Sequence, residues 1–99
     1  MIVNRRTFQV KGGCWEEAVA LMVAETKRVR LPHARRIYSS NIGPFDRLVF
    51  EAEFENLADY EEFWAEWSAS PEGDAFVEKW ETLVKSGGMN EIWTLEEWR

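Results

Sequence analysis

The sequence predicts an α+β fold of the ferredoxin-like type, a four-stranded antiparallel sheet with helices on one face. Three observations predict it. Residues 47–55 alternate between apolar and polar side chains, as a strand with one buried face does. Residues 15–30 place apolar side chains at helical spacing. Glycine pairs and prolines separate the segments, which gives the order β-α-β-β-α-α-β.

The first half of the chain contributes a strand and a long helix. Residues 2–10 are rich in β-branched and aromatic side chains, and Gly12 and Gly13 break the strand that they predict. In the helix expected over 15–30, acidic side chains occupy the first turn and basic side chains the last. These charges complement the helix dipole. Pro32 then prevents the helix from continuing.

Five further elements follow this proline. We expect strands over 35–40, 47–55 and 91–97, and helices over 57–69 and 71–85. Asn56 is of a type that caps helix N-termini, and Pro71 suits the first position of a helix. All seven elements belong to one domain, residues 1–99, since a chain of this length is too short for two cores.

The two faces of the predicted sheet differ in character. Right-handed crossovers place the helices on one face, where we expect the row that contains Phe8, Phe50 and Phe54. The row expected on the open face mixes apolar and charged side chains: Val3, Arg5, Thr7, Ile37, Val49, Glu51, Glu53, Trp93 and Leu95. Such a face is too apolar to leave in water and too charged for a core. We therefore expect a homodimer that packs two open faces together.

The charge of the chain limits its partners. The net charge of −6 argues against nucleic acid, because neutralising phosphates needs a basic surface. Residues 1–49 carry nine basic and four acidic side chains, whereas residues 50–99 carry three and fourteen. The two halves either neutralise each other or form solvated faces of opposite sign. No apolar stretch is long enough for a membrane span and no signal region is visible, so we expect a soluble, cytoplasmic protein.

Few side chains suit catalysis. The single cysteine and single histidine exclude a disulfide and a Cys/His metal cage, and we expect no metal site and no cofactor. Phosphate-loop, HExxH and GxSxG motifs are absent. His33 is the candidate general base, and a histidine in a surface loop is the alternative interpretation.

A ligand pocket is predicted between the sheet and the helices. Asn4 and Arg6 are polar residues in an otherwise apolar row, and such groups need a partner or a cavity. As a site they would orient a ligand between aromatic walls formed by Tyr38, Phe63, Trp64, Trp67, Phe76 and Trp80. The alternatives are a structural hydrogen bond for the polar pair and a plain hydrophobic core for the aromatic residues.

Carboxylates alternate along the strand expected over 47–55. Glu51, Glu53 and Glu55 spread over ~13 Å, which is too far for one metal ion. Arginines lie in two of the other predicted strands, at positions 5, 35 and 36, and at the start of this strand, at position 47. The pattern therefore favours cross-strand salt bridges.

The element order and the run NIGPFDRLVFEAEFENLADYEEFWAEWSASPEGDAF (residues 41–76) resemble a known superfamily, the dimeric α+β barrels. Within it, the chain is similar to the NIPSNAP-like branch of small bacterial proteins over nearly its whole length. The resemblance implies a homodimer whose sheets pack face to face.

This superfamily includes cofactor-independent quinone-forming monooxygenases, haem-degrading monooxygenases, polyketide cyclases and lactone isomerases. The resemblance to the haem degraders, at VNRRTFQVKGG and in the helix over 57–69, places their catalytic Asn on Asn4 and their Trp on Trp67. Their haem-ligating histidine would fall near Phe76 or Val77, and this chain has no histidine there. The histidine and tyrosine of the cyclases correspond to His33 and Tyr38.

These observations lead to one main hypothesis and two others. The main hypothesis is a homodimeric small-molecule protein that binds or acts on a flat apolar or aromatic compound, as a monooxygenase without a cofactor. Asn4, Arg6 and His33 are its candidate catalytic residues, with Asn4 and Arg6 orienting a carbonyl or phenolate. The second is a non-catalytic binding or scaffold homodimer of NIPSNAP type, whose pocket is filled by its own side chains. The third is haem binding through His33 or another ligand.

Overall fold

The computed structural model describes residues 1–97 and contains the predicted elements in the predicted order. The chain is an α+β protein with the ferredoxin-like arrangement, as the sequence predicts. The elements are β1 (Ile2–Gln9), α1 (Trp15–Arg28), β2 (Arg35–Ser39), β3 (Arg47–Phe54), α2 (Leu57–Ala69), α3 (Pro71–Trp80) and β4 (Met89–Thr94).

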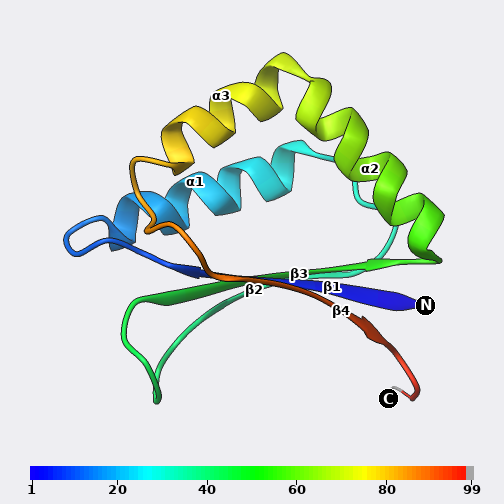
Figure 1. The fold of residues 1–99 in the computed structure, drawn as a ribbon, viewed down its shortest axis with the longest axis horizontal. Coiled ribbons are helices and arrows are strands. Elements are labelled where there is room, and N and C mark those ends of the chain that lie inside the picture. Colours follow the sequence, from blue (N-terminus) through cyan, green and yellow to red (C-terminus); the bar gives the residue numbers. More distant parts are fainter. Residues whose placement is uncertain (98–99) are drawn as a thin grey trace.

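The four strands form one sheet in the order β2-β3-β1-β4, and every neighbouring pair is antiparallel. The central strand β1 pairs with β3 along its whole length, from Ile2 opposite Phe54 to Gln9 opposite Arg47. All three helices cover one face of the sheet, and the other face carries none (Figure 1). None of these helices, within the described residues, is long and apolar enough to cross a bilayer.

Side-chain caps start both α2 and α3. The Asn56 carboxamide oxygen accepts the Asp59 backbone N–H at 2.8 Å and starts α2. After α2 ends at Ala69, the Ser70 hydroxyl accepts the Gly73 N–H at 2.9 Å and starts α3. A Cβ atom at Gly73 would overlap the Trp67 carbonyl, so the turn between the helices depends on glycine there. This tight turn lets aromatic side chains of both helices meet over the sheet.

The chain after α3 differs from the sequence prediction. The helix ends at Trp80 rather than near residue 85, because the following turn docks on the end of β1. The Lys85 N–H donates to the Gln9 carbonyl at 2.8 Å, and that bond replaces a further helical turn. Gly87 and Gly88, at φ of +93° and +97°, lead into β4. β4 therefore begins at Met89 and ends at Thr94, where its pairing with β1 ends, rather than covering residues 91–97.

The hydrophobic core lies between the helices and the covered face of the sheet. Phe50 and Phe54 are buried there and Phe8 packs against the same core, as the alternation predicts. Ile37 pairs opposite Phe50 and also packs on this core, so its predicted place on the open face is wrong. The five residues of β2 carry an arginine in each alternating row, and only the register with β3 selects the covered row.

Candidate functional site

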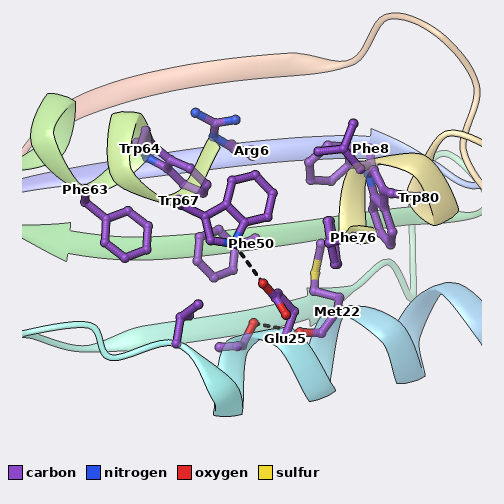
Figure 2. A pocket seen from close by; sticks show the side chains of 13 residues that line it. Arg6, Phe8, Met22, Glu25, Phe50, Phe63, Trp64, Trp67, Phe76 and Trp80 are labelled. Carbon is purple, nitrogen blue, oxygen red and sulfur yellow. Dashed lines mark hydrogen bonds between the residues drawn. The ribbon is translucent and has the colours of Figure 1, made fainter. Parts of the chain in front are cut away.

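A pocket of about 150 Å³ lies between the helices and the covered face of the sheet. Side chains from β1, β3 and all three helices line it (Figure 2). The lining residues are Arg6, Phe8, Met22, Glu25, Thr26, Val29, Phe50, Phe63, Trp64, Trp67, Phe76, Val77 and Trp80. Five of the six predicted aromatic wall residues are among them.

The aromatic wall is a continuous series of ring contacts that runs across α2 and α3. Phe63, Trp64 and Trp67 lie one turn apart or less on α2, and Phe76 and Trp80 lie one turn apart on α3. The ring centroids of Trp64 and Trp67 are 5.4 Å apart, and those of Trp67 and Phe76 are 5.5 Å apart. Most of these contacts are edge-to-face, which fixes ring orientation. Trp67 and Phe76 thus join the two helices into one wall.

Arg6 supplies positive charge at the end of the pocket nearest Trp64 and Trp67 (Figure 2). Its guanidinium carbon lies 3.9 Å from the Trp64 ring centroid, a cation–π contact. Its Nε–H donates to the Asn4 carboxamide oxygen at 3.2 Å, and Nη2 donates to the Tyr60 hydroxyl at 3.4 Å. β1 and α2 together therefore fix the guanidinium.

Asn4 lies behind Arg6 rather than in the pocket lining, and it is completely buried. Its carboxamide nitrogen donates to the Asn90 carboxamide oxygen at 2.7 Å and to the Glu91 carbonyl at 3.0 Å. The Asn90 amide donates in turn to the Tyr60 hydroxyl at 3.4 Å. This network ties β4 to β1 and positions Arg6. Asn4 thus makes the structural hydrogen bonds that the sequence left as one alternative.

Glu25 contributes a carboxylate to the pocket lining from α1. It accepts the Trp67 indole N–H at 2.7 Å and forms an ion pair with Arg28, one turn further along, at 2.6 Å. Hydrogen bonding from Arg28 lowers the pKa of Glu25, against the opposing effect of burial, and Trp67 lowers it further. Glu25 is therefore ionised at neutral pH, and its charge is compensated inside the protein.

His33 and Tyr38 do not line the pocket. His33 lies in the loop before β2, with Nε2 3.1 Å from a Glu55 carboxylate oxygen. Tyr38 pairs opposite Val49 and faces the open side of the sheet, where its hydroxyl donates to Glu51 at 3.1 Å. Burial, and next the Glu51 charge, raise the pKa of Tyr38. Tyr38 was expected in the pocket wall and Ile37 on the open face. Both predictions were wrong because the sequence does not show which row of β2 faces the helices.

The sequence pattern of the NIPSNAP family matches residues 3–97 of this chain. The chain belongs to the NIPSNAP family. A NIPSNAP protein from Agrobacterium tumefaciens has a similar structure, with a TM-score of 0.82, 21% identity and coverage of 94% of this chain and 90% of the other. A second protein from the same organism has a TM-score of 0.79 at 26% identity, with coverage of 95% and 92%.

An antibiotic biosynthesis monooxygenase shares the fold at 15% identity, with a TM-score of 0.73 and coverage of 98% of this chain and all of the other. No curated protein matches the sequence. These comparisons show the family and the fold of this NIPSNAP chain, as the resemblance implied.

The pocket of this NIPSNAP chain does not suit haem. No histidine, cysteine or tyrosine lines it in the described chain, and the lining residue of another haem-ligating type, Met22, is buried in the core. Phe76 and Val77 do line the pocket, at the place where the haem degraders' histidine was expected. The pocket volume is about 150 Å³, and a cavity of that volume in another protein holds benzene. A porphyrin is far larger than benzene.

The open face carries cross-strand ion pairs, as predicted. Arg5 on β1 lies 2.6 Å from Glu51, and Arg36 on β2 lies 3.4 Å from Glu53. The two glutamates are buried beneath these arginines, with 7% and 8% of their surface exposed. No group of three potential metal ligands occurs among residues 1–97. Glu51 and Glu53 thus pair with arginines of the neighbouring strands.

Sequence reasoning missed the contribution of α1 to the pocket. The segment 15–30 was recognised only as an amphipathic helix, yet its residues Met22, Thr26 and Val29 line the pocket. Glu25 follows Met22 by three residues and precedes Val29 by four, which puts it beside the same stripe. An acidic residue in that position was the available signal.

Proposed function

We propose that this NIPSNAP protein binds a small, flat aromatic molecule in the pocket between its helices and its sheet. The observation that carries the proposal is a cavity of about 150 Å³ bounded by aromatic rings, with a single arginine at one end. An apolar cavity of about this volume holds benzene in another protein. The pocket thus suits one aromatic ring with small substituents.

The competing hypothesis is a scaffold whose pocket its own side chains fill. Titration of the protein with benzamide, a naphthoquinone and hemin, followed by tryptophan fluorescence and calorimetry, separates the two. We expect a single-ring compound to quench the fluorescence of the pocket tryptophans and to release or absorb heat at one site per chain. No response to any single-ring compound at millimolar concentration would support the scaffold.

A blocking variant shows where the ligand binds. Val77 lines the pocket and is 39% exposed, so Val77→Trp can fill the pocket entrance without disturbing the core. Ala75→Trp is the matched control, because Ala75 is exposed on the same helix but does not line the pocket. Calorimetry should show binding lost in the first variant and kept in the second. Equal binding by both would place the ligand elsewhere.

Oxygenation of the bound ring is the catalytic form of this proposal. The supporting observation is the guanidinium of Arg6 beside the aromatic wall, because a fixed cation favours the phenolate form of a bound phenol. Ionisation of the phenol raises the electron density of the ring and makes its oxidation by O₂ easier. Antibiotic biosynthesis monooxygenase is the name of one protein with the same fold.

The proposed reaction converts a phenol and O₂ into a para-quinone and water. One oxygen atom replaces the para hydrogen as a carbonyl, the phenolic O–H becomes the second carbonyl, and the other oxygen atom leaves as water. Trp64 and Trp67 would hold the ring, Arg6 would stabilise the anionic oxygen, and Asn4 would act as a positioning residue behind Arg6. His33 lies outside this arrangement. Oxygen uptake at an oxygen electrode and the absorbance of the quinone product test this reaction. If a phenol binds but no oxygen is consumed, the oxygenation proposal is wrong and the binding proposal stands.

We also propose that residues 1–99 act as one domain in a homodimer formed through the open face. Trp93 on that face is 53% exposed, and it lies opposite Val3 in the β1–β4 ladder. The ion pairs of Glu51 and Glu53 neutralise the charges between these apolar side chains. Burying such a mixed face against its own copy satisfies both kinds of side chain.

A further inference from the structure

The hydrogen-bonding capacity that the pocket lining offers to a ligand comes from Arg6. The indole N–H groups of Trp64 and Trp80 also have no partner among the described residues, but both nitrogens are fully buried within the wall. The acceptors are already engaged, since Glu25 accepts bonds from Trp67 and Arg28. The Thr26 hydroxyl donates to the Met22 carbonyl at 2.7 Å. A ligand that complements this lining therefore offers acceptor oxygens rather than donors.

Arg6 adds a positive charge that no carboxylate in the described chain neutralises. Its contacts are the Asn4 carboxamide, the Tyr60 hydroxyl and the Trp64 ring, all of which are uncharged. The neighbouring Arg5, on the opposite face of the same strand, shows the contrast, because it lies 2.6 Å from the Glu51 carboxylate. Arg6 is partly buried against aromatic rings, an environment in which an unpaired charge is costly.

We propose that the ligand is a single-ring aromatic anion whose charged oxygen pairs with Arg6. This inference rests on the proposed function and specifies its ligand class. The planar guanidinium presents N–H groups that match a carboxylate or phenolate oxygen. The ring of such a ligand occupies the space between the tryptophans of α2 and α3, where the aromatic wall offers it ring contacts.

Benzoate and benzamide form the test, because they share a ring, a size and a carbonyl but differ in charge. We expect calorimetry on the wild-type protein to give about 10-fold or more tighter binding of benzoate, as a charge-assisted hydrogen bond implies. Arg6→Gln should abolish the preference by weakening benzoate binding about 10-fold more than benzamide binding. Lys27→Gln is the matched control: it removes an exposed cation of α1 that does not line the pocket and should keep the preference.

A second measurement avoids dependence on the folding of the variant. In the wild-type protein, the NMR signal of the Arg6 Nε–H should move further at saturation with benzoate than at saturation with benzamide. Each outcome has one meaning. Equal affinity for the two probes would overturn the inference and leave the proposed function standing, whereas binding of neither would overturn both. A benzoate preference that persists in Arg6→Gln, or an unmoved Arg6 signal, would overturn the assignment to Arg6.

Discussion

The indole N–H of Trp67 on α2 donates to the Glu25 carboxylate on α1 across 2.7 Å (Figure 2). This is the polar bond that joins the two helices over the pocket, within a wall otherwise built from aromatic contacts. Arg28 holds the same carboxylate from the next turn of α1. Glu25 therefore connects the aromatic wall, through Trp67, to the ion pair with Arg28 on α1.

A pair of substitutions measures the worth of this bond. Trp67→Phe and Trp64→Phe remove the same atoms from neighbouring wall positions, but only Trp67 has an N–H with a partner. We expect Trp67→Phe to be more destabilising than Trp64→Phe by about 1–2 kcal/mol, because it breaks a bond to a charged acceptor. Urea unfolding of both variants gives the difference. Equal losses would mean that the Trp67–Glu25 bond adds nothing to stability.

The stability of the protein should depend on pH through Glu25. Because its folded pKa lies below the usual value of 4.5, the carboxylate stabilises the fold fully above that value. The contribution disappears as the pH falls through the lowered pKa. The difference in unfolding free energy between wild type and Glu25→Gln should thus be largest near neutral pH and shrink below about 4.5. An equal difference at pH 7 and at pH 3, measured by urea unfolding, would contradict this dependence on Glu25.

Asn4→Ala should destabilise the fold. The substitution removes both donors to Asn90 and Glu91 and the acceptor of the Arg6 Nε–H, all around a fully buried site. Stranded groups of this kind cost about 1–3 kcal/mol, which lowers the Tm of a 99-residue domain by several degrees. Asn41→Ala, in the exposed loop between β2 and β3, is the control and should melt like wild type. An unchanged Tm for Asn4→Ala would place Asn4 outside the structural network.

The wall of the pocket could be predicted from the sequence because helical spacing identifies a face directly. Phe63, Trp64 and Trp67 recur on one side of α2, and Phe76 and Trp80 on one side of α3, so both the helices and their inner faces follow from the pattern. The same periodicity identified the covered row of β3. These predictions needed no knowledge of long-range pairing.

The failures concern features that depend on partners distant in the sequence. Ile37 and Tyr38 were each predicted on the wrong face of the sheet, because β2 is short and only its register with β3 decides which row is covered. The end of α3 depends on its docking against Gln9, some 75 residues earlier, and not on a local stop signal. Glu25 was missed because its role comes from Trp67, which lies on another helix.

The open sheet face gives the remaining prediction. Trp93 is the large apolar side chain that this face exposes most clearly, at 53%, and burying it in a dimer favours association. Sedimentation at micromolar concentration should therefore show a dimer for the wild-type protein and a monomer for Trp93→Glu, since an unpaired carboxylate buried in an interface is costly.

Leu57→Glu is the matched control for this change. Leu57 is 50% exposed, but it lies at the start of α2 on the helical side of the molecule, away from the proposed interface. The same charge introduced there should leave the dimer intact. Circular dichroism of both variants verifies that each is folded before its mass is compared. A wild-type protein that sediments as an 11.6 kDa particle, or a Trp93→Glu variant that stays dimeric, would contradict association through the open face.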